Sequence, residues 1–512
     1  MATKQVFKNT IALYLRQIVV TIVSLVVIRV VLKTLGVDDY GLYTVITGIV
    51  SLCVFIPGAL GSATQRFFSY AIGKGDNNSI SKILLLNIII YSFMALVIAL
   101  VLESIGLWFV IEHLNIPDDR YSTVIKLYHY SVLSFIFTLL TSPFISIIIA
   151  FEDMRSYAYI SIFEALLKLG SVYLLTSFTR DKLDAYGCLI LIVSIIIMLT
   201  YMSYCFIKYK EIRRFNNSFD KVLLIELIEF IGWTFFGAFT SVIRTQAVTL
   251  LLNQMFNPVV VAARGIAITV STQAMVFANS FNTGLYPTII KSYASKNYKL
   301  MNQVIYQGSI LSFFLIWIFA LPLIVFMDEI LKLWLVTPPE GVVLFSRLSL
   351  VEVLVMSLSL SIATAARAPG KMKEYELKLG VVQILIFFTS WFLLYCGYGA
   401  ESVFIVAIIA NIIMFFIRLH LVEKLVGLNG IKFIKEVFYP LTLVVLLSSV
   451  FSFYIKSYMP GGFIFLLINS LSIMLFTVLV MYIFGISKNM RTRVNNEIFR
   501  RVNFYRKYNN ER

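Results

Sequence analysis

The sequence predicts an all-α polytopic membrane protein, and three observations carry that prediction. The chain of 512 residues is 59% hydrophobic and only 14% charged, with a mean hydropathy of +0.88, which is outside the range of soluble globular proteins. Apolar stretches long enough to cross a bilayer alternate with short polar loops, and there are about 14 of them. Lys and Arg gather in alternate loops, as they do in membrane proteins.

The apolar stretches define the helices in order. We expect spanning helices over residues 10–33, 41–64, 81–103, 124–150, 157–179, 185–208, 232–253, 258–285, 303–327, 341–366, 377–396, 402–422, 433–456 and 462–486. An even number of spans places both termini on the same side of the membrane.

The charge of the loops gives the orientation. The loops and tail on the side of the termini carry 29 Lys and Arg, whereas the opposite loops carry 7. Because basic loops stay in the cytoplasm, we expect both termini there and the chain in the bacterial inner membrane. The net charge of +16 therefore does not indicate a nucleic-acid partner. The basic tail, residues 487–512, is expected to bind anionic lipid headgroups.

The chain has features of two related halves. Val27-Ile28-Arg29 has a counterpart in Val242-Ile243-Arg244, and six helices on each side give a parallel repeat of the kind found in transporters. We expect an N-terminal lobe over 1–210, an interfacial linker helix over 211–231 and a C-terminal lobe over 232–424. Two further helices would lie within 425–486.

Seven cations fall inside the expected helices, and their depth follows from the helical rise. They are Arg16, Arg29, Arg66, Lys168, Arg244, Arg264 and Arg347. Arg244 is roughly 18 Å into its helix, near the midplane, whereas Arg16 and Arg264 are about 9 Å from an end. Arg29, Arg66 and Arg347 lie near helix ends, where a side chain either snorkels to the surface or faces a cavity.

Spacing along each helix predicts the partners of these cations. Glu164 precedes Lys168 by four residues, so the two form an ion pair that lines a cavity on our interpretation. Glu352 lies near Arg347 and is expected to pair with it. Four arginines have no acidic partner in their own helices: Arg16, Arg66, Arg244 and Arg264. Unneutralised guanidiniums suit a polyanion such as a diphosphate, which Arg binds through paired hydrogen bonds.

No catalytic or metal-binding pattern accompanies these cations. The three histidines, His113, His129 and His420, are dispersed, without Cys or carboxylate at ligand spacing. We therefore expect a protein that is not an enzyme and holds no metal or other cofactor. Coupling to a Na⁺ or H⁺ gradient, or to the membrane potential, stays open.

Four strings resemble a known family. They are TLGVDDYGLY (Thr34 to Tyr43), SATQRFFSYAIGKGD (Ser62 to Asp76), NPVVVAARGIAI (Asn257 to Ile268) and YPTIIKSYA (Tyr286 to Ala294). They resemble helix pairs of bacterial polysaccharide-biosynthesis flippases, the Wzx-like branch of the multidrug/oligosaccharidyl-lipid/polysaccharide (MOP) exporter superfamily. The resemblance implies a transport step in the biosynthesis of surface polysaccharides such as O-antigen and lipopolysaccharide.

The resemblance implies two pseudo-symmetric six-helix lobes around a central cavity, plus two C-terminal helices. It implies that the protein moves undecaprenyl-diphosphate-linked repeat units from the cytoplasmic to the periplasmic leaflet by alternating access. It also implies basic cavity residues that meet the diphosphate: by position Arg16, Arg66 and Arg264, to which the depth of Arg244 adds a fourth.

Two alternatives and several partners complete the expectations. A cation-coupled multidrug antiporter of the same superfamily would need buried carboxylates, chiefly Glu164 and Glu352. A membrane glycosyltransferase or polymerase would need an acidic catalytic loop. The expected partners are the lipid-linked oligosaccharide and membrane lipids, with a polysaccharide polymerase and glycosyltransferases left open. Sugar contacts would come from scattered polar residues: Gln65, Gln246, Asn253, Gln273, Asn279 and Asn282.

Overall fold

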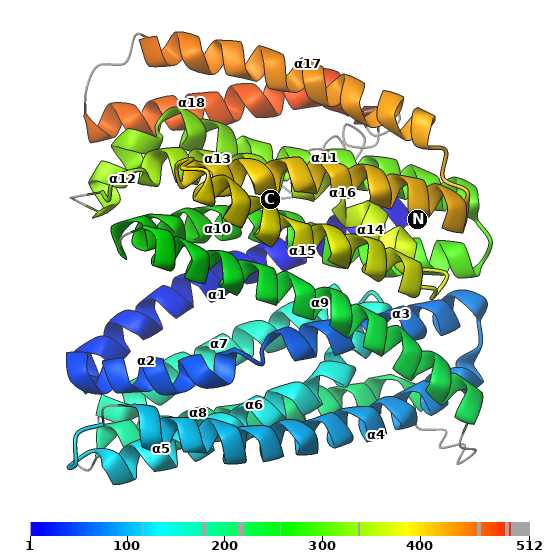
Figure 1. Ribbon diagram of the computed structural model, residues 1–512. Helices are drawn as coiled ribbons and strands as arrows, with labels where there is room; N and C mark the ends of the chain where they lie inside the picture. Colours follow the sequence, from blue (N-terminus) through cyan, green and yellow to red (C-terminus); the bar gives the residue numbers. More distant parts are fainter. Residues whose placement is uncertain are drawn as a thin grey trace, which may run out of the picture. The chain divides into compact units, whose positions relative to one another are not determined.

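The structure is helical throughout the part of the chain that it describes, as the sequence predicts (Figure 1). It is a computed structural model, and it describes residues 2–114, 116–176, 181–212, 220–256, 258–335, 338–457, 462–486 and 491–492.

The number of spanning helices agrees with the expected number. Among the described residues, 13 helices are long and apolar enough to cross a membrane. A pair of helices over Asp39–Ser51 and Phe55–Lys74, bent by 43°, makes 14 if it is one broken span. The prediction of about 14 transmembrane helices is therefore confirmed.

Contacts divide the chain into two compact units. Unit 1 contains Met1–Ile243, Thr283–Met301 and Thr364–Val381. The elements that begin and end within its first segment are α1 (Ala2–Leu35), α2 (Val37–Ser51), α3 (Phe55–Lys74), α4 (Asn77–Val101), the π-helix η1 (Leu102–Gly106), α5 (Leu107–His113), α6 (Tyr121–Ala150), α7 (Met154–Thr176), α8 (Lys182–Lys208) and the 3₁₀ turn η2 (Lys210–Ile212).

Unit 2 contains Arg244–Asn282, Asn302–Ala363 and Val382–Arg512. Five helices pass from one unit to the other: α9 (Lys221–Met255), α10 (Pro258–Ala294), α11 (Tyr298–Val325), α14 (Leu360–Arg367) and α15 (Lys373–Tyr395). The elements wholly within unit 2 are α12 (Met327–Leu335), α13 (Val342–Leu358), α16 (Glu401–Val426), α17 (Gly430–Ser457), α18 (Phe463–Val480) and the π-helix η3 (Met481–Gly485).

These units differ from the segments that we expect from the sequence. Residues 220–231 do not form a separate linker helix, because α9 runs without a break from Lys221 to Met255. Two stretches of the second half, Thr283–Met301 and Thr364–Val381, group with the first half by contacts. The assignment of lobes to 1–210 and 232–424 stays a prediction, and most of the tail over 487–512 lies outside the described residues.

Unit 1 has a core in which large side chains and a small polar network are buried together. Leu60, Leu127 and Leu139 are fully buried in one cluster. Thr64 of α3 donates a hydrogen bond of 2.6 Å to Asn87 Oδ1 and lies 3.1 Å from the Tyr91 hydroxyl, both on α4. Because lipid offers no hydrogen-bond partners, buried polar groups pair with one another and fix the two helices side by side.

Local sequence also fixes the turn between α3 and α4. Gly75 has a positive φ of 73°, a left-handed conformation that ends α3 and that glycine adopts without strain. Asp76 then caps α4 by accepting a hydrogen bond from the Ser79 amide at 3.2 Å.

In unit 2, two basic side chains close the end of α11. Arg347 Nε donates to the Ile324 carbonyl at 2.9 Å, and Lys456 Nζ donates to the Val325 carbonyl at 2.7 Å. The last carbonyls of a helix have no partner within the helix, and cations there also interact favourably with the helix dipole. Arg347 therefore has a structural role at a helix end.

We expect Arg347→Ala and Lys456→Ala each to lower the free energy of unfolding by about 1.5–3 kcal/mol, the value of a hydrogen bond made by a charged group. Thermal unfolding of the detergent-solubilised protein measures the change. Lys332→Ala is the control, because Lys332 is exposed and pairs only along its own helix with Asp328. Melting temperatures equal to that of the wild type for both test variants would contradict the capping role.

Candidate functional site

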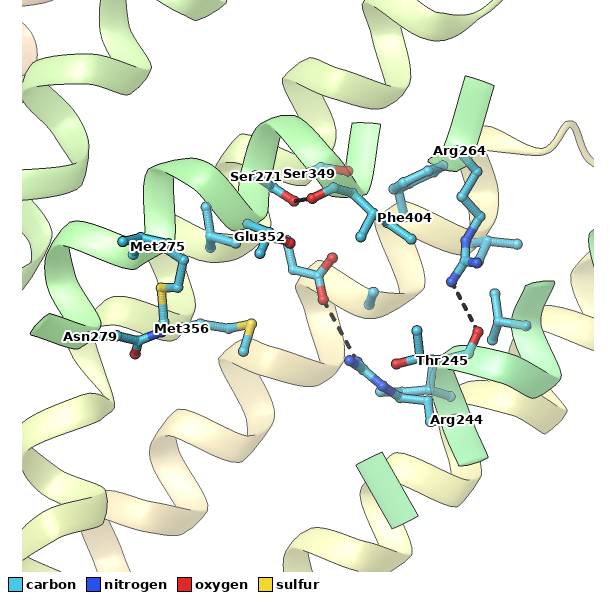
Figure 2. Close-up of a pocket in the computed structure, with 18 residues that line it drawn as sticks. Arg244, Thr245, Arg264, Ser271, Met275, Asn279, Ser349, Glu352, Met356 and Phe404 are labelled. Carbon is cyan, nitrogen blue, oxygen red and sulfur yellow. Dashed lines mark hydrogen bonds and ion pairs between the residues drawn. The ribbon is translucent and has the colours of Figure 1, made fainter. Parts of the chain in front are cut away.

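Two of the predicted arginines line one pocket in unit 2. The pocket has a volume of about 280 Å³, and Arg244, Arg264 and Glu352 are the charged residues among its described lining. Arg244 lies on α9, Arg264 on α10 and Glu352 on α13. Figure 2 shows the two guanidinium groups on the same side of the pocket, with Thr245 close to both. The structure thus brings together side chains from three helices, as a binding site inside a helix bundle requires.

Neutral oxygen atoms hold Arg264 in place. Its Nη1 donates a hydrogen bond to Thr249 Oγ1, and its Nη2 donates to the Thr245 carbonyl at 3.4 Å. Thr245 and Thr249 are one turn apart on α9, so this helix presents both acceptors to α10. Arg264 is 8% exposed. Its hydrogen-bond partners are therefore neutral, and the Glu352 carboxylate acts on it electrostatically without a hydrogen bond.

Arg244 faces the carboxylate of the pocket. Its Nη1 is 3.7 Å from Glu352 Oε1, and the dashed line in Figure 2 joins the two side chains. The same carboxylate oxygen accepts a hydrogen bond of 3.0 Å from Asn411 Nδ2 on α16. Two guanidinium groups and one carboxylate leave one formal positive charge among the charged side chains of the lining.

The opposite side of the pocket is mostly apolar. Figure 2 shows Met275, Met356 and Asn279 gathered away from the arginines. Met275 and Asn279 are four residues apart on α10 and so share one face of it. Of the six polar residues that we expect to contact sugar, Asn279 is the one that lines this pocket. The pocket therefore has a charged side and a mostly apolar side.

Arg16 lies in the other unit, on α1. Its Nη1 donates to the Tyr157 hydroxyl of α7 at 2.9 Å, and its Cζ is 4.9 Å from the centre of the Tyr157 ring. Its Nη2 donates to Gln17 Oε1 at 3.1 Å. These partners are neutral, as expected from the absence of an acidic residue in its helix. The structure does not bring Arg16 into the pocket of Arg244 and Arg264.

Arg66 is enclosed within unit 1 and does not line that pocket. It is 6% exposed, and its Nη2 donates to the Ala368 carbonyl at 3.1 Å. Its Cζ lies between 4.5 and 5.5 Å from the ring centres of Phe67, Tyr70 and Phe230. Three aromatic faces and a carbonyl therefore solvate this cation inside the protein. A role in binding the diphosphate stays a prediction for Arg66, as it does for Arg16.

The expected pair of Glu164 and Lys168 is present, with 2.7 Å between Lys168 Nζ and Glu164 Oε1. That this pair lines a cavity stays a prediction. Arg29 is exposed on α1.

The expected pair of Glu352 with Arg347 is wrong. Arg347 instead bonds to Ile324, and Glu352 pairs with Arg244. The reason lies in the spacing: residues five apart on a helix point in different directions, whereas pairs form at three or four.

Sequence reasoning missed Thr249 and Asn411. Both are small polar residues in long apolar helices, a signal that marks interhelical hydrogen bonds in membrane proteins. Among the described residues, no group of three or more His, Cys, Asp or Glu is placed to hold a metal ion.

Comparisons with known proteins agree with this architecture. Residues 6–293 match the family model described as polysaccharide biosynthesis protein, and residues 234–375 match the MatE model. A search of curated protein sequences finds no match.

Solved structures share the fold. One is the outward-facing conformation of a multidrug resistance MATE family transporter of the MOP superfamily, with a TM-score of 0.71 and 14% identity over 83% of this chain and 96% of that chain. Another is the Vibrio cholerae MATE transporter VcmN in its bent form, with a TM-score of 0.65 and 18% identity over 85% and 98% of the two chains.

The match over residues 6–293 covers more than half of the 512 residues, and the fold is the one that the four strings lead us to expect. The chain is a membrane transporter of the MOP superfamily and belongs to the polysaccharide biosynthesis protein family.

Proposed function

We propose that this protein moves undecaprenyl-diphosphate-linked oligosaccharide repeat units across the bacterial inner membrane, with both termini in the cytoplasm, for surface polysaccharides such as O-antigen. The observation that carries the proposal is the pocket in which Arg244 and Arg264 meet and a single carboxylate faces Arg244. A cation in the middle of a membrane helix costs about 2.5–3.5 kcal/mol even on the lenient insertion scale. An anionic ligand that offsets this cost accounts for its presence.

The hydrogen bonds of Arg264 support an anion-binding role. Thr249 and Thr245 hold the guanidinium at one side of the pocket. A binding site needs such a fixed first contact, because immobilising a free arginine on binding would lower the affinity. Arginine also keeps its charge at every physiological pH and can contact a phosphate through two parallel hydrogen bonds.

The size of the pocket indicates which part of the substrate it takes. Pockets for drug-sized ligands measure about 300–1,000 Å³, whereas this one measures about 280 Å³. A pocket near the lower end of that range suits a phosphate-bearing head. The prenyl chain would remain in lipid, and the sugars would lie outside the pocket during alternating access.

A cation-coupled multidrug antiporter is the second candidate, and two observations favour it. The MatE model matches residues 234–375, and Glu352 supplies a carboxylate in the pocket. Drug antiporters need such groups to bind protons, sodium ions or cationic drugs. The positive excess in the lining argues against a cationic substrate. Resistance to cationic dyes that Glu352→Gln abolishes would favour this candidate over the flippase.

We expect Arg244→Gln and Arg264→Gln each to weaken binding of farnesyl diphosphate to the purified protein by tenfold or more. A hydrogen bond to a charged group contributes about 1.5–3 kcal/mol, and about 1.4 kcal/mol corresponds to tenfold. Calorimetric titration in lipid nanodiscs measures the affinity. The double variant should also stop glycan export in cells while still inserting into the membrane.

Arg347→Gln is the matched control, because Arg347 lies in the same unit and bonds to the Ile324 carbonyl away from the pocket lining. It should bind the probe as the wild type does at a temperature where all variants are folded. Wild-type affinity in both Arg244→Gln and Arg264→Gln would remove the proposed site.

We also expect an inside-negative potential to drive the head group outward. A potential of 100 mV is worth about 2.3 kcal/mol per charge, or roughly 5 kcal/mol for two negative charges. Proteoliposomes with a potassium diffusion potential and a fluorescent isoprenoid-diphosphate sugar would report the movement through quenching from one side. Rates that are identical with and without the potential would show that the head crosses with its charge balanced.

A further inference from the structure

The lining of the pocket includes a carboxylate, that of Glu352. Glu352 Oε1 lies 3.7 Å from Arg244 Nη1, and both side chains are largely buried, at 18% and 17% exposure. The two residues belong to different helices, α13 and α9. A distance of 3.7 Å exceeds the roughly 2.7–3.2 Å of an N–H···O hydrogen bond. The attraction between the two groups is therefore that of an ion pair without a close hydrogen bond.

Asn411 also contacts the Glu352 carboxylate, through a hydrogen bond. Asn411 Nδ2 donates to Glu352 Oε1 at 3.0 Å and also donates to the Ala407 carbonyl at 2.9 Å. Asn411 is 2% exposed, and its contact with Ala407 lies within its own helix. The Glu352 carboxylate is thus hydrogen-bonded to Asn411 of α16, whereas its attraction to Arg244 acts across the longer distance of 3.7 Å.

The two arginines are consequently unequal. Arg264 donates to neutral oxygen atoms of Thr249 and Thr245 and interacts with Glu352 only electrostatically, without a hydrogen bond, whereas Arg244 has the Glu352 carboxylate at 3.7 Å. An anion that enters the pocket meets a favourable charge at Arg264. At Arg244 it meets both the attraction of the guanidinium and the repulsion of Glu352, and like charges placed together cost several kcal/mol.

We propose that Glu352 is a positioning and specificity-determining residue, an internal counter-anion that a ligand must outcompete for Arg244. This inference rests on the proposed function of the pocket. A diphosphate carries enough charge to engage both arginines despite the carboxylate, whereas a monophosphate gains mainly at Arg264. Because repulsion by Glu352 grows with the charge of the ligand, the carboxylate lowers the preference for the diphosphate and so sets how strongly the pocket discriminates between the two. In the empty pocket, the same carboxylate reduces the repulsion between the two guanidiniums.

The test compares Glu352→Gln with the wild type, using farnesyl diphosphate and farnesyl monophosphate as probes in nanodiscs. The two probes share one tail and differ in the charge of the head. We expect Glu352→Gln to bind both more tightly and to gain more for the diphosphate, because the repulsion by Glu352 grows with the charge of the ligand. The ratio of the diphosphate affinity to the monophosphate affinity should rise by about tenfold, the factor that corresponds to about 1.4 kcal/mol. A purely structural role for Glu352 would instead weaken both probes together.

Two further variants test whether the effect is specific to Glu352 and acts through Arg244. Asp328→Asn removes a carboxylate from an exposed ion pair in the same unit, outside the pocket lining, and it should leave the ratio unchanged. In an Arg244→Gln background, the substitution of Glu352 should no longer alter the ratio, because the effect acts through Arg244.

The outcomes separate this inference from the proposed function. An unchanged ratio in Glu352→Gln, with normal diphosphate binding by the wild type that depends on Arg244 and Arg264, would overturn the role of Glu352 alone. Absence of binding of either probe by the wild type and by Glu352→Gln would overturn both. Tighter binding of both probes with an increased ratio supports the internal counter-anion.

Discussion

Every polar group within a membrane-spanning helix must find its partner inside the protein, because lipid supplies none. Two groups of contacts in the described part of the chain follow this constraint. Thr64, Asn87 and Tyr91 pair with one another in unit 1, and the indole of Trp317 donates to Ser448 Oγ at 3.0 Å in unit 2. Interhelical bonds of this kind fix which helices are neighbours, and the placement of the arginines follows from the same requirement.

The arginines satisfy this requirement in different ways: some contact packed side chains and carbonyls, and others line a pocket. Arg347 bonds to the carbonyl end of α11, and Arg66 is surrounded by aromatic rings and a carbonyl. Neither lines the pocket, and their contacts are those of packed side chains. Arg244 and Arg264 line a pocket and retain an excess of positive charge there. Orientation by neighbouring groups, free volume and unbalanced charge together support the ligand site proposed at Arg244 and Arg264, and the roles of Arg16 and Arg66 in binding stay predictions.

The sequence predicts the helices well and the contacts between them poorly. Hydropathy finds the spans because length and apolar character are local properties that the bilayer imposes. The pair of Glu164 and Lys168 is predicted for the same reason, since four residues on one helix fix their proximity. Pairing between helices depends on packing, which no local pattern encodes.

The predictions that are wrong concern features that no local pattern encodes. Glu352 pairs with Arg244 on another helix rather than with its neighbour Arg347. Arg66 contacts Ala368, 302 residues away. An interfacial linker helix is predicted over 211–231, yet the backbone continues unbroken from Lys221 through α9. A change in polarity marks a change of environment and does not by itself end a helix.

The helices that belong to both units have a mechanical consequence. The division within α10 falls between Asn282 and Thr283, beside Gly284 and shortly before Pro287. Proline has no amide hydrogen, so Pro287 cannot donate to the carbonyl of Thr283, four residues earlier. The helix therefore has one fewer backbone hydrogen bond to break at the place where it leaves one unit for the other. A change of angle between its two segments therefore costs the least free energy there, and α10 bends most easily at this turn.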